Sequence, residues 1–344
     1  MAHTSPNSVS LLRRNAFVFL ALAILGPSLL WAASFAPPRG KVLHIAGQDR
    51  ESIGEYIHDV CGDGRECPLP AGLAFYTSLK LSGVSSPHAN EPGDNHQDLE
   101  FLLRQPKTMA LQVGLYLNAS ELAPVAEGKF DGSVDRLARV IRDSGRVVYL
   151  RIGYEFDGPH NAYDPALYRE AYRHIVDRLR AAKLTKVAYV WHSQARSETY
   201  QGRDMMEWYP GDKYVDWVGI SYFFEDESAA RQQVVEIARR KKLPVMICEA
   251  SAIRPTPQSK ALHGQAYWDY WYEPFFRFIE STPEIQAFSI IQCNWDGQKQ
   301  WIPLSWGDGR LTSDAVVLRN WRAKMKSDRF LHNRADLKDM LTAR

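Results

Sequence analysis

Two glutamates stand where apolar runs end, and their type and placement could serve to break a glycosidic bond. Glu155 follows the apolar run at residues 147–152, and Glu249 directly follows the run at residues 244–248. Two carboxyl groups about 5 to 5.5 Å apart can act as a pair, one attacking the sugar while the other first donates and then removes a proton. This chemistry requires unequal pKa values, and the sequence alone leaves the two roles unassigned. A strand-end ion pair for Glu249 and a helix cap for Glu155 are the plainer alternatives.

The elements that must position these glutamates alternate between strand and helix patterns. Apolar runs rich in β-branched residues predict buried parallel strands. They lie at residues 42–46, 72–76, 109–117, 147–152, 187–191, 215–221, 244–248 and 285–292. Amphipathic stretches predict helices at residues 133–143, 165–182, 229–241, 267–280 and 313–326. Asp164 and Pro165 are typical of the first residues of a helix.

Eight strand-then-helix repeats indicate an α/β protein with a single (β/α)8 TIM barrel, and a doubly wound sheet is the alternative architecture. Functional side chains in such barrels lie at the C-terminal ends of the strands. Glu155 would lie just past the end of the fourth strand and Glu249 at the end of the seventh. Strands three apart in a ring of eight are nearly opposite, so both side chains can reach one bond at the mouth of the barrel.

Composition supports one large catalytic domain after an export segment. The chain has 344 residues with a net charge of +2, which gives no electrostatic reason to expect nucleic-acid binding. Arg13 and Arg14 precede an uncharged run and a small-residue triplet ending at Ser34, as in a signal peptide or an uncleaved membrane anchor. We therefore predict a signal peptide or anchor at residues 1–36, the catalytic barrel at 41–328 and a C-terminal tail at 329–344.

The sequence lacks the motifs typical of nucleotide binding, zinc-dependent hydrolysis and esterase activity. The sequence has no Walker loop, no GxGxxG, no His-Glu-x-x-His and no Gly-x-Ser-x-Gly elbow. We therefore expect neither a cofactor nor a metal ion. Cys61 and Cys67 bracket a turn-rich segment and could form a disulfide in an oxidising compartment, whereas Cys248 and Cys293 lie in strand-like runs and are expected to be buried thiols.

Three segments near the predicted strand ends stand out: RIGYEFDG at residues 151–158, WYPGDKYVDWVGISY at 208–222 and PVMICE at 244–249. They resemble glycoside hydrolase family 26, whose members are retaining β-glycanases with a (β/α)8 fold. Gly47-Gln48, after the first predicted strand, resembles the family's opening motif more weakly. The resemblance extends over most of residues 41–326. It implies that Glu155 is the acid/base and Glu249 the nucleophile. It also implies that Tyr222 hydrogen-bonds the nucleophile and that Trp295 forms the aromatic floor under the sugar at the cleavage point.

Four more residues near the strand ends are candidates for contact with substrate. Trp191 and His192 end the fifth predicted strand, where a structural role is equally open, and Arg151 could orient a carboxylate. Tyr154 occupies the place where the mannanases of the family usually carry His. The departure extends the expected substrates from β-mannan to β-glucans and bacterial exopolysaccharides.

Together these expectations describe an exported, monomeric, retaining endo-β-glycanase that acts on a β-linked polysaccharide by double displacement. It would be secreted or periplasmic, and membrane-bound only through an uncleaved N-terminal segment. Two rivals use the same scaffold. A glycan-binding protein would not need both glutamates, and a transglycosylating accessory of polysaccharide biosynthesis would use both with a sugar as acceptor.

Overall fold

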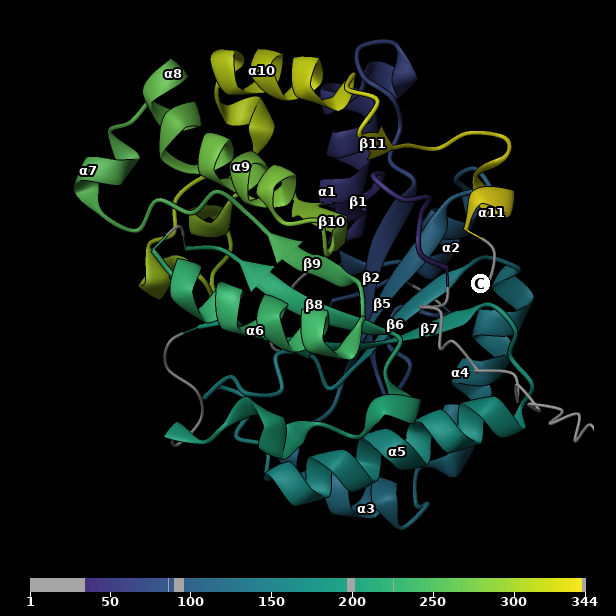
Figure 1. Ribbon diagram of the computed structural model, residues 1–344. Coiled ribbons are helices and arrows are strands. Elements are labelled where there is room, and N and C mark those ends of the chain that lie inside the picture. The colour runs from purple at the N-terminus through teal and green to yellow at the C-terminus, as the bar shows by residue number, and fades with distance from the viewer. Residues whose placement is uncertain (1–34, 86, 90–95, 197–201, 225, 342–344) are drawn as a thin grey trace, which may run out of the picture. The chain divides into compact units, whose positions relative to one another are not determined.

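The computed structural model describes residues 35–85, 87–89, 96–196, 202–224 and 226–341 (Figure 1). The export segment predicted for residues 1–36 lies outside these residues, except for Phe35 and Ala36. Among the described residues, no helix combines the length and apolarity that a membrane crossing requires.

Eight parallel strands close into a barrel, which confirms the predicted fold. Each strand pairs with the next along the chain, and β10 pairs with β1 to close the ring. The strands are β1 (Val42–Gly47), β2 (Gly72–Ser78), β5 (Ala110–Tyr116), β6 (Val148–Ile152), β7 (Val187–Ser193), β8 (Trp217–Tyr222), β9 (Val245–Ala250) and β10 (Ile285–Ile291). Almost every strand residue is buried, because helices cover the outer face and side chains fill the interior.

Helices follow the strands and cover the barrel (Figure 1). The helices are α1 (Arg50–Glu55), α2 (Leu99–Arg104), α3 (Leu122–Ala126), α4 (Asp131–Ser144), α5 (Pro165–Ala181), α6 (Ser228–Lys241), α7 (Pro257–Lys260), α8 (Gly264–Tyr267), α9 (Glu273–Ser281), α10 (Ala315–Met325) and α11 (Leu337–Met340). The predicted start of α5 is confirmed, since the Asp164 side chain accepts a hydrogen bond from the Leu167 backbone N–H. The helix predicted at 267–280 contains a π-helical turn, Trp268–Tyr272, just before Pro274, which has no N–H to donate.

Short extended segments complete the described chain. The strands β3 (His88–Ala89) and β4 (His96–Gln97) form a two-stranded antiparallel pair between β2 and α2. The strand β11 (Phe330–Leu331) lies parallel to the start of β1.

The segment predicted as a C-terminal tail packs against the barrel up to Leu341. The buried side chains of Leu337 and Leu341 belong to the same apolar cluster as Leu43 of β1, and Phe35 joins it. The Tyr149 hydroxyl, inside the barrel, donates a hydrogen bond of 2.7 Å to the Phe35 carbonyl. Both ends of the described chain therefore contribute to the packing of the barrel interior.

All four cysteines are buried and free in this structure. The Cys61 and Cys67 sulfur atoms lie 2.8 Å apart at the short turn that joins them, and their pairing stays a prediction. Cys248 lies inside the barrel on β9, and Cys293 lies just after β10.

Candidate active site

A β-bulge near the end of β9 sets the direction of Glu249. Ile220 of β8 pairs with Ile247, but the next residue, Ser221, pairs with Glu249, so Cys248 is an extra residue in β9. The Gln112 side chain crosses the barrel from β5 and donates a hydrogen bond of 2.9 Å to the Cys248 carbonyl. Bulges re-aim side chains next to active sites, and here the bulge directs Glu249 into the barrel mouth.

Two donors hold the Glu249 carboxylate from within the barrel. The Arg151 guanidinium donates to Glu249 Oε1 at 2.5 Å, and the Tyr76 hydroxyl donates to the same oxygen at 2.7 Å. The Arg151 side chain is fully buried. Burial raises the pKa of the Glu249 carboxyl, Arg151 opposes that rise, and the nearby charge of Glu155 adds to it. Arg151 was predicted to orient a carboxylate, and the structure places it in contact with Glu249.

Gly114 of β5 makes room for Arg151 inside the barrel. A Cβ atom at residue 114 would lie 2.8 Å from Arg151 Nη2 and 2.9 Å from the Tyr76 ring. The guanidinium carbon lies 4.7 Å from the ring centre of Tyr76 and 5.0 Å from that of Tyr154. Cation–π attraction from two tyrosine faces therefore supports the buried charge that Glu249 pairs with.

Glu155 lies on a strained loop after β6 rather than on the strand itself. Its φ of 52° is in the left-handed region, which non-glycine residues rarely adopt. The Asn161 side-chain amide holds the loop by donating to the carbonyls of Tyr154 and Glu155, both at 2.9 Å. Such strain persists only where the surroundings enforce it, and it is common at functional sites.

The two oxygens of Glu155 face different partners. The Ser221 hydroxyl donates to Oε1 at 2.5 Å from inside the barrel, and His160 Nε2 lies 3.1 Å from Oε2. The His160 side chain is 49% exposed, so this second partner is in contact with solvent. Burial raises the pKa of Glu155, but the hydrogen bond and charge of His160 outweigh it and lower the pKa to about 2.

A chain of hydrogen bonds connects the two carboxylates through the barrel interior. Arg151 Nη1 lies 3.3 Å from His192 Nδ1, and His192 Nε2 lies 3.1 Å from Ser221 Oγ. Arg151 can only donate, so Nδ1 accepts and Nε2 carries the hydrogen that is donated to Ser221. Burial lowers the pKa of His192 well below its ordinary value, which keeps the ring neutral as this direction requires. Arg151 thus supports Glu249 directly and Glu155 through His192 and Ser221.

The alternation of side chains along the strands separates the predicted candidates into two groups. Arg151 and His192 point into the barrel, as their contacts show. Trp191 points outward and is fully buried, and its ring stacks on Phe156 at 4.4 Å. Trp191 is therefore a core residue with no exposed surface to offer a substrate, which corrects its prediction as a binding residue.

Tyr222 also lies on the outer face of the barrel. Its ring contacts Trp271 and Phe275 edge-on at 5.4 Å and 5.2 Å, and the Arg231 guanidinium lies 4.1 Å from its centre. The neighbouring Ser221 points inward instead. The tyrosine that the structure shows donating to Glu249 is Tyr76 of β2, a residue that the sequence did not single out.

Trp295 lies beside the end of the strand that carries Glu249. It begins a short 3-10 helix, Trp295–Gly297, after β10. Its indole N–H donates to the Ser251 hydroxyl at 2.8 Å, two residues after Glu249. The ring is 2% exposed and contacts Phe223, Trp301 and Trp306 edge-on. Trp295 is thus held rigidly at this side of the mouth, and its contact with sugar stays a prediction.

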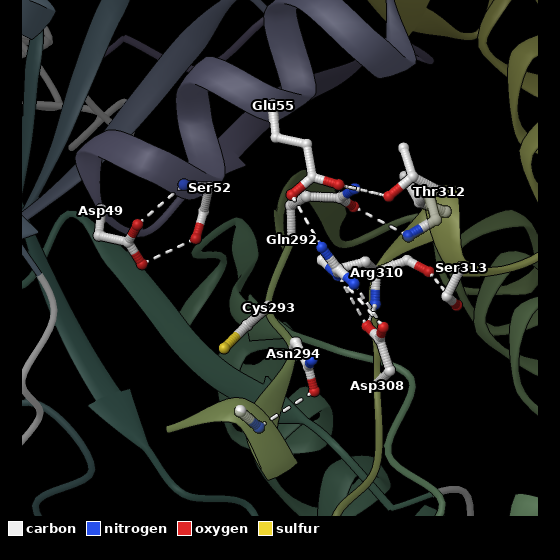
Figure 2. A network of polar contacts seen from close by, with 12 residues as sticks. Asp49, Ser52, Glu55, Gln292, Cys293, Asn294, Asp308, Arg310, Thr312 and Ser313 are labelled. Atoms are coloured by element: carbon white, nitrogen blue, oxygen red, sulfur yellow. Dashed lines mark hydrogen bonds and ion pairs between the residues drawn. The ribbon is translucent and has the colours of Figure 1, made fainter. Parts of the chain in front are cut away.

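A polar network fixes the loop that presents Trp295 (Figure 2). Gln292 accepts a hydrogen bond from the Leu311 backbone N–H at 2.9 Å and donates to Glu55 of α1 at 3.3 Å. Arg310 contacts Glu55 and forms hydrogen bonds with Asp308. Figure 2 also shows Asn294 capping the 3-10 helix through the Gly297 backbone N–H. The network joins both ends of the loop to α1.

Sequence reasoning missed the residues that complete the site. Tyr76, Ser221, His160 and Asn161 are polar residues without a distinguishing motif. The bulge in β9 turns Glu249 into the barrel mouth, and the loop conformation brings His160 and Asn161 to Glu155. A serine or tyrosine at an inward strand position next to the mouth would have been the available signal. Within the described residues, no three His, Cys, Asp or Glu side chains are grouped to hold a metal ion.

Comparison with known proteins shows which class of enzyme the chain is similar to. The model of glycosyl hydrolase family 26 matches residues 154–281. A β-1,3-xylanase from a Vibrio species is 29% identical, and the alignment covers 92% of this chain and 72% of the relative. A second β-1,3-xylanase, from an Alcaligenes species, is 28% identical, with 87% and 66% covered. This chain thus aligns with about two thirds to three quarters of the length of these relatives.

Solved structures share the fold at low sequence identity. A family 26 β-mannanase from Bacteroides ovatus has a TM-score of 0.62 and 15% identity, over 87% of this chain and 93% of that one. An endo-β-1,4-mannanase double mutant from Cellulomonas fimi has a TM-score of 0.59 and 16% identity, over 89% and 75%. The protein is a glycoside hydrolase acting on O-glycosyl bonds. The chain is similar to glycoside hydrolase family 26, as the family model and the two β-1,3-xylanases indicate.

Proposed function

We propose that the protein is an exported, retaining endo-β-glycanase in which Glu249 is the nucleophile and Glu155 the acid/base. The observation that carries the proposal is the shared hydrogen-bond chain of the two carboxylates, Glu155–Ser221–His192–Arg151–Glu249. A glycan-binding protein would have no need to connect two buried carboxylates in this way. Both groups lie at the C-terminal end of the barrel, where substrates bind in this fold.

The proposed reaction is double displacement. Glu249 attacks the anomeric carbon while Glu155 protonates the departing glycosidic oxygen, so that an ester forms between Glu249 and the sugar. Glu155 then takes a proton from water, and the water oxygen attacks the anomeric carbon and breaks the ester. Arg151 and Tyr76 both donate to Glu249 Oε1, which leaves Oε2 as the oxygen that attacks.

We propose β-1,3-xylan as the first substrate to examine, because the two curated relatives aligned over most of this chain carry that activity in their names. Tyr154, in place of the histidine usual in the mannanases, is consistent with a substrate other than mannan. Mixed-linkage β-glucan, β-mannan and a bacterial exopolysaccharide are the alternatives. Transglycosylation, with a sugar hydroxyl replacing water in the second step, would use the same residues.

A polysaccharide panel tests the proposal. The full chain is incubated with β-1,3-xylan, mixed-linkage glucan, mannan and a bacterial exopolysaccharide, and new reducing ends and product masses are measured. We expect oligosaccharides of several lengths from one polymer, first released in the β-configuration as followed by proton NMR. Glu249→Ala serves as the inactive control. Longer oligosaccharides without new reducing ends would indicate transglycosylation, and products first released in the α-configuration would overturn the retaining mechanism.

Export remains part of this proposal and rests on residues 1–36. Cleavage between the small residues near Ser34 would leave Phe35 and Ala36 on the mature chain, where they pack at the barrel. A monomer is expected, and neither a cofactor nor a nucleic-acid partner is proposed.

A further inference from the structure

The glycosidase proposal raises a proton problem at Glu155. An acid catalyst must carry a proton when substrate binds, but the structure favours an ionised Glu155 because its pKa is lowered to about 2. Ser221 donates to Oε1 from within the barrel, so a proton can reach this carboxylate only at Oε2. The group at Oε2 is His160, with Nε2 at 3.1 Å.

The loop is built to bring His160 to this place. A Cβ atom at residue 158 would lie 2.5 Å from His160 Cε1, so only glycine leaves space for the imidazole to fold back over Glu155. Gly158 does not have a positive φ, so space rather than backbone conformation requires the glycine. The next residue, Pro159, restricts the chain, and Asn161 ties the loop to the carbonyls of Tyr154 and Glu155.

The charges that face His160 favour a bound proton. Glu155 is in contact, and Asp157 of the same loop and Glu249 of β9 also face the imidazole. His192 of β7 lies on the far side of Glu155 and is neutral. Burial lowers the pKa of His160, but the hydrogen bond and charge of Glu155 raise it above the ordinary value. The ring is half-exposed, so it exchanges protons with water.

We infer that His160 is the proton reservoir of Glu155, a positioning residue that holds the catalytic proton and passes it to Oε2 when the glycosidic oxygen is protonated. This inference rests on the proposed function. In the first step the proton on His160 Nε2 moves to Glu155 Oε2, and Glu155 transfers it to the departing oxygen, which leaves His160 neutral and Glu155 ionised. In the second step Glu155 takes a proton from the attacking water and returns it to His160. The pair therefore carries one proton at the start and at the end.

The first test needs no substrate. Imidazole NMR of the full chain follows the titration of His160 in the wild type and in Glu155→Gln. We expect His160 to titrate above the ordinary value of about 6.5 in the wild type, and to fall by about one pH unit or more in Glu155→Gln. Equal titration in the two proteins would overturn the inference, whatever the substrate of the enzyme proves to be.

The second test is the pH dependence of kcat/KM on the polysaccharide that the panel identifies. In the wild type the shared proton is lost at the raised pKa of His160, so activity persists above neutral pH. In His160→Gln the amide can still donate to Oε2, but Glu155 must hold the proton alone. We expect the alkaline limb to move about one unit or more toward acid, with near wild-type activity at pH 5 and about tenfold less at pH 8.

Two further variants separate this role from simple structural damage. Gly158→Ala displaces His160 without removing it and should move the alkaline limb in the same direction, whereas Gly158→Ala combined with His160→Gln should add nothing further. His174→Gln is the matched control, because His174 pairs with Asp131 on the helix layer at 2.6 Å. An aryl glycoside with a good leaving group, which needs no proton, should show no alkaline loss of kcat/KM in His160→Gln.

The outcomes distinguish the two proposals. If the wild type cleaves no polysaccharide, the proposed function fails, while the NMR titration still decides whether His160 and Glu155 share a proton. If the wild type is active and His160→Gln keeps the wild-type alkaline limb, the reservoir role is wrong and the glycosidase proposal stands.

Discussion

The two carboxylates of the site occupy opposite kinds of surroundings. Glu249 ends a barrel strand, and both of its donors, Arg151 and Tyr76, are buried in the interior. Glu155 lies on a strained loop, and one of its partners, His160, is half-exposed. A nucleophile must be held rigidly and kept charged, whereas an acid/base must gain and lose a proton in each cycle. The contrast is consistent with the two proposed roles, with buried fixed donors for Glu249 and a titrating partner for Glu155.

The contrast should be clearest in the free energy of unfolding when the charged partner of each carboxylate is removed. Arg151→Met leaves Glu249 buried without its cation, and we expect a loss of about 3–5 kcal/mol in the free energy of unfolding. His160→Gln removes a half-exposed partner and should cost about 1 kcal/mol or less. Urea unfolding of both variants at pH 7 measures the difference. Equal losses in the free energy of unfolding would show that the Arg151–Glu249 and His160–Glu155 pairs contribute equally to stability, which would contradict the contrast.

Asp157 should make the stability of the loop that carries Glu155 sensitive to pH. Its side chain accepts from Ser193 Oγ at 2.6 Å and from the Gln194 backbone N–H at 2.7 Å, which fastens the loop to the end of β7. Burial raises its pKa from 3.8 to about 6 despite these bonds. The folded state thus binds more protons than the unfolded state between these values, and stability must fall as pH rises through this window.

The measurement compares wild type with Asp157→Asn, which cannot titrate. We expect the stability of the variant relative to wild type to increase by about 2.4 kcal/mol between pH 4 and pH 7. Urea unfolding across this range gives the difference directly. A constant difference would show that Asp157 keeps its ordinary pKa in the folded protein.

Asn161→Ala should destabilise the loop that carries Glu155 without affecting the strand that carries Glu249. The variant loses the two hydrogen bonds to the carbonyls of Tyr154 and Glu155, at a cost of about 1–3 kcal/mol. Hydrogen exchange should increase at residues 153–161 and stay unchanged at residues 245–250 on β9. Faster hydrogen exchange in both segments would mean that the Glu155 loop and β9 open together.

The sequence was sufficient for the fold and for the location of the two glutamates at the C-terminal end of the barrel, because long apolar runs and a charged residue at the end of a run are strong signals. The catalytic roles of the two glutamates stay a prediction. The sequence was insufficient for Trp191 and Tyr222. In a barrel strand both faces are buried, so an apolar run does not reveal which residues point inward. Trp191 and His192 are neighbours on β7, yet only His192 joins the site.

The partners of the glutamates depend on features that no local pattern marks. Glu249 points into the barrel mouth, within reach of Tyr76 and Arg151, because β9 contains a bulge at Cys248. His160 reaches Glu155 only because residue 158 has no side chain. Tyr76 and Arg151 come from strands that lie far from β9 in sequence and meet it across the interior. Long-range register and loop conformation decided these contacts, and neither follows from residue type and spacing.

The assignment of roles to the two carboxylates is tested most directly by azide rescue. Glu155→Ala and Glu249→Ala are each given an aryl β-glycoside with a good leaving group, built on the disaccharide of the preferred polysaccharide, and sodium azide. With Glu155 as acid/base, Glu155→Ala still forms the ester with Glu249, and azide should release a β-glycosyl azide. With Glu249 as nucleophile, azide should occupy its place in Glu249→Ala and give an α-glycosyl azide. Proton NMR of the products distinguishes the two, and the reverse pattern would contradict the account.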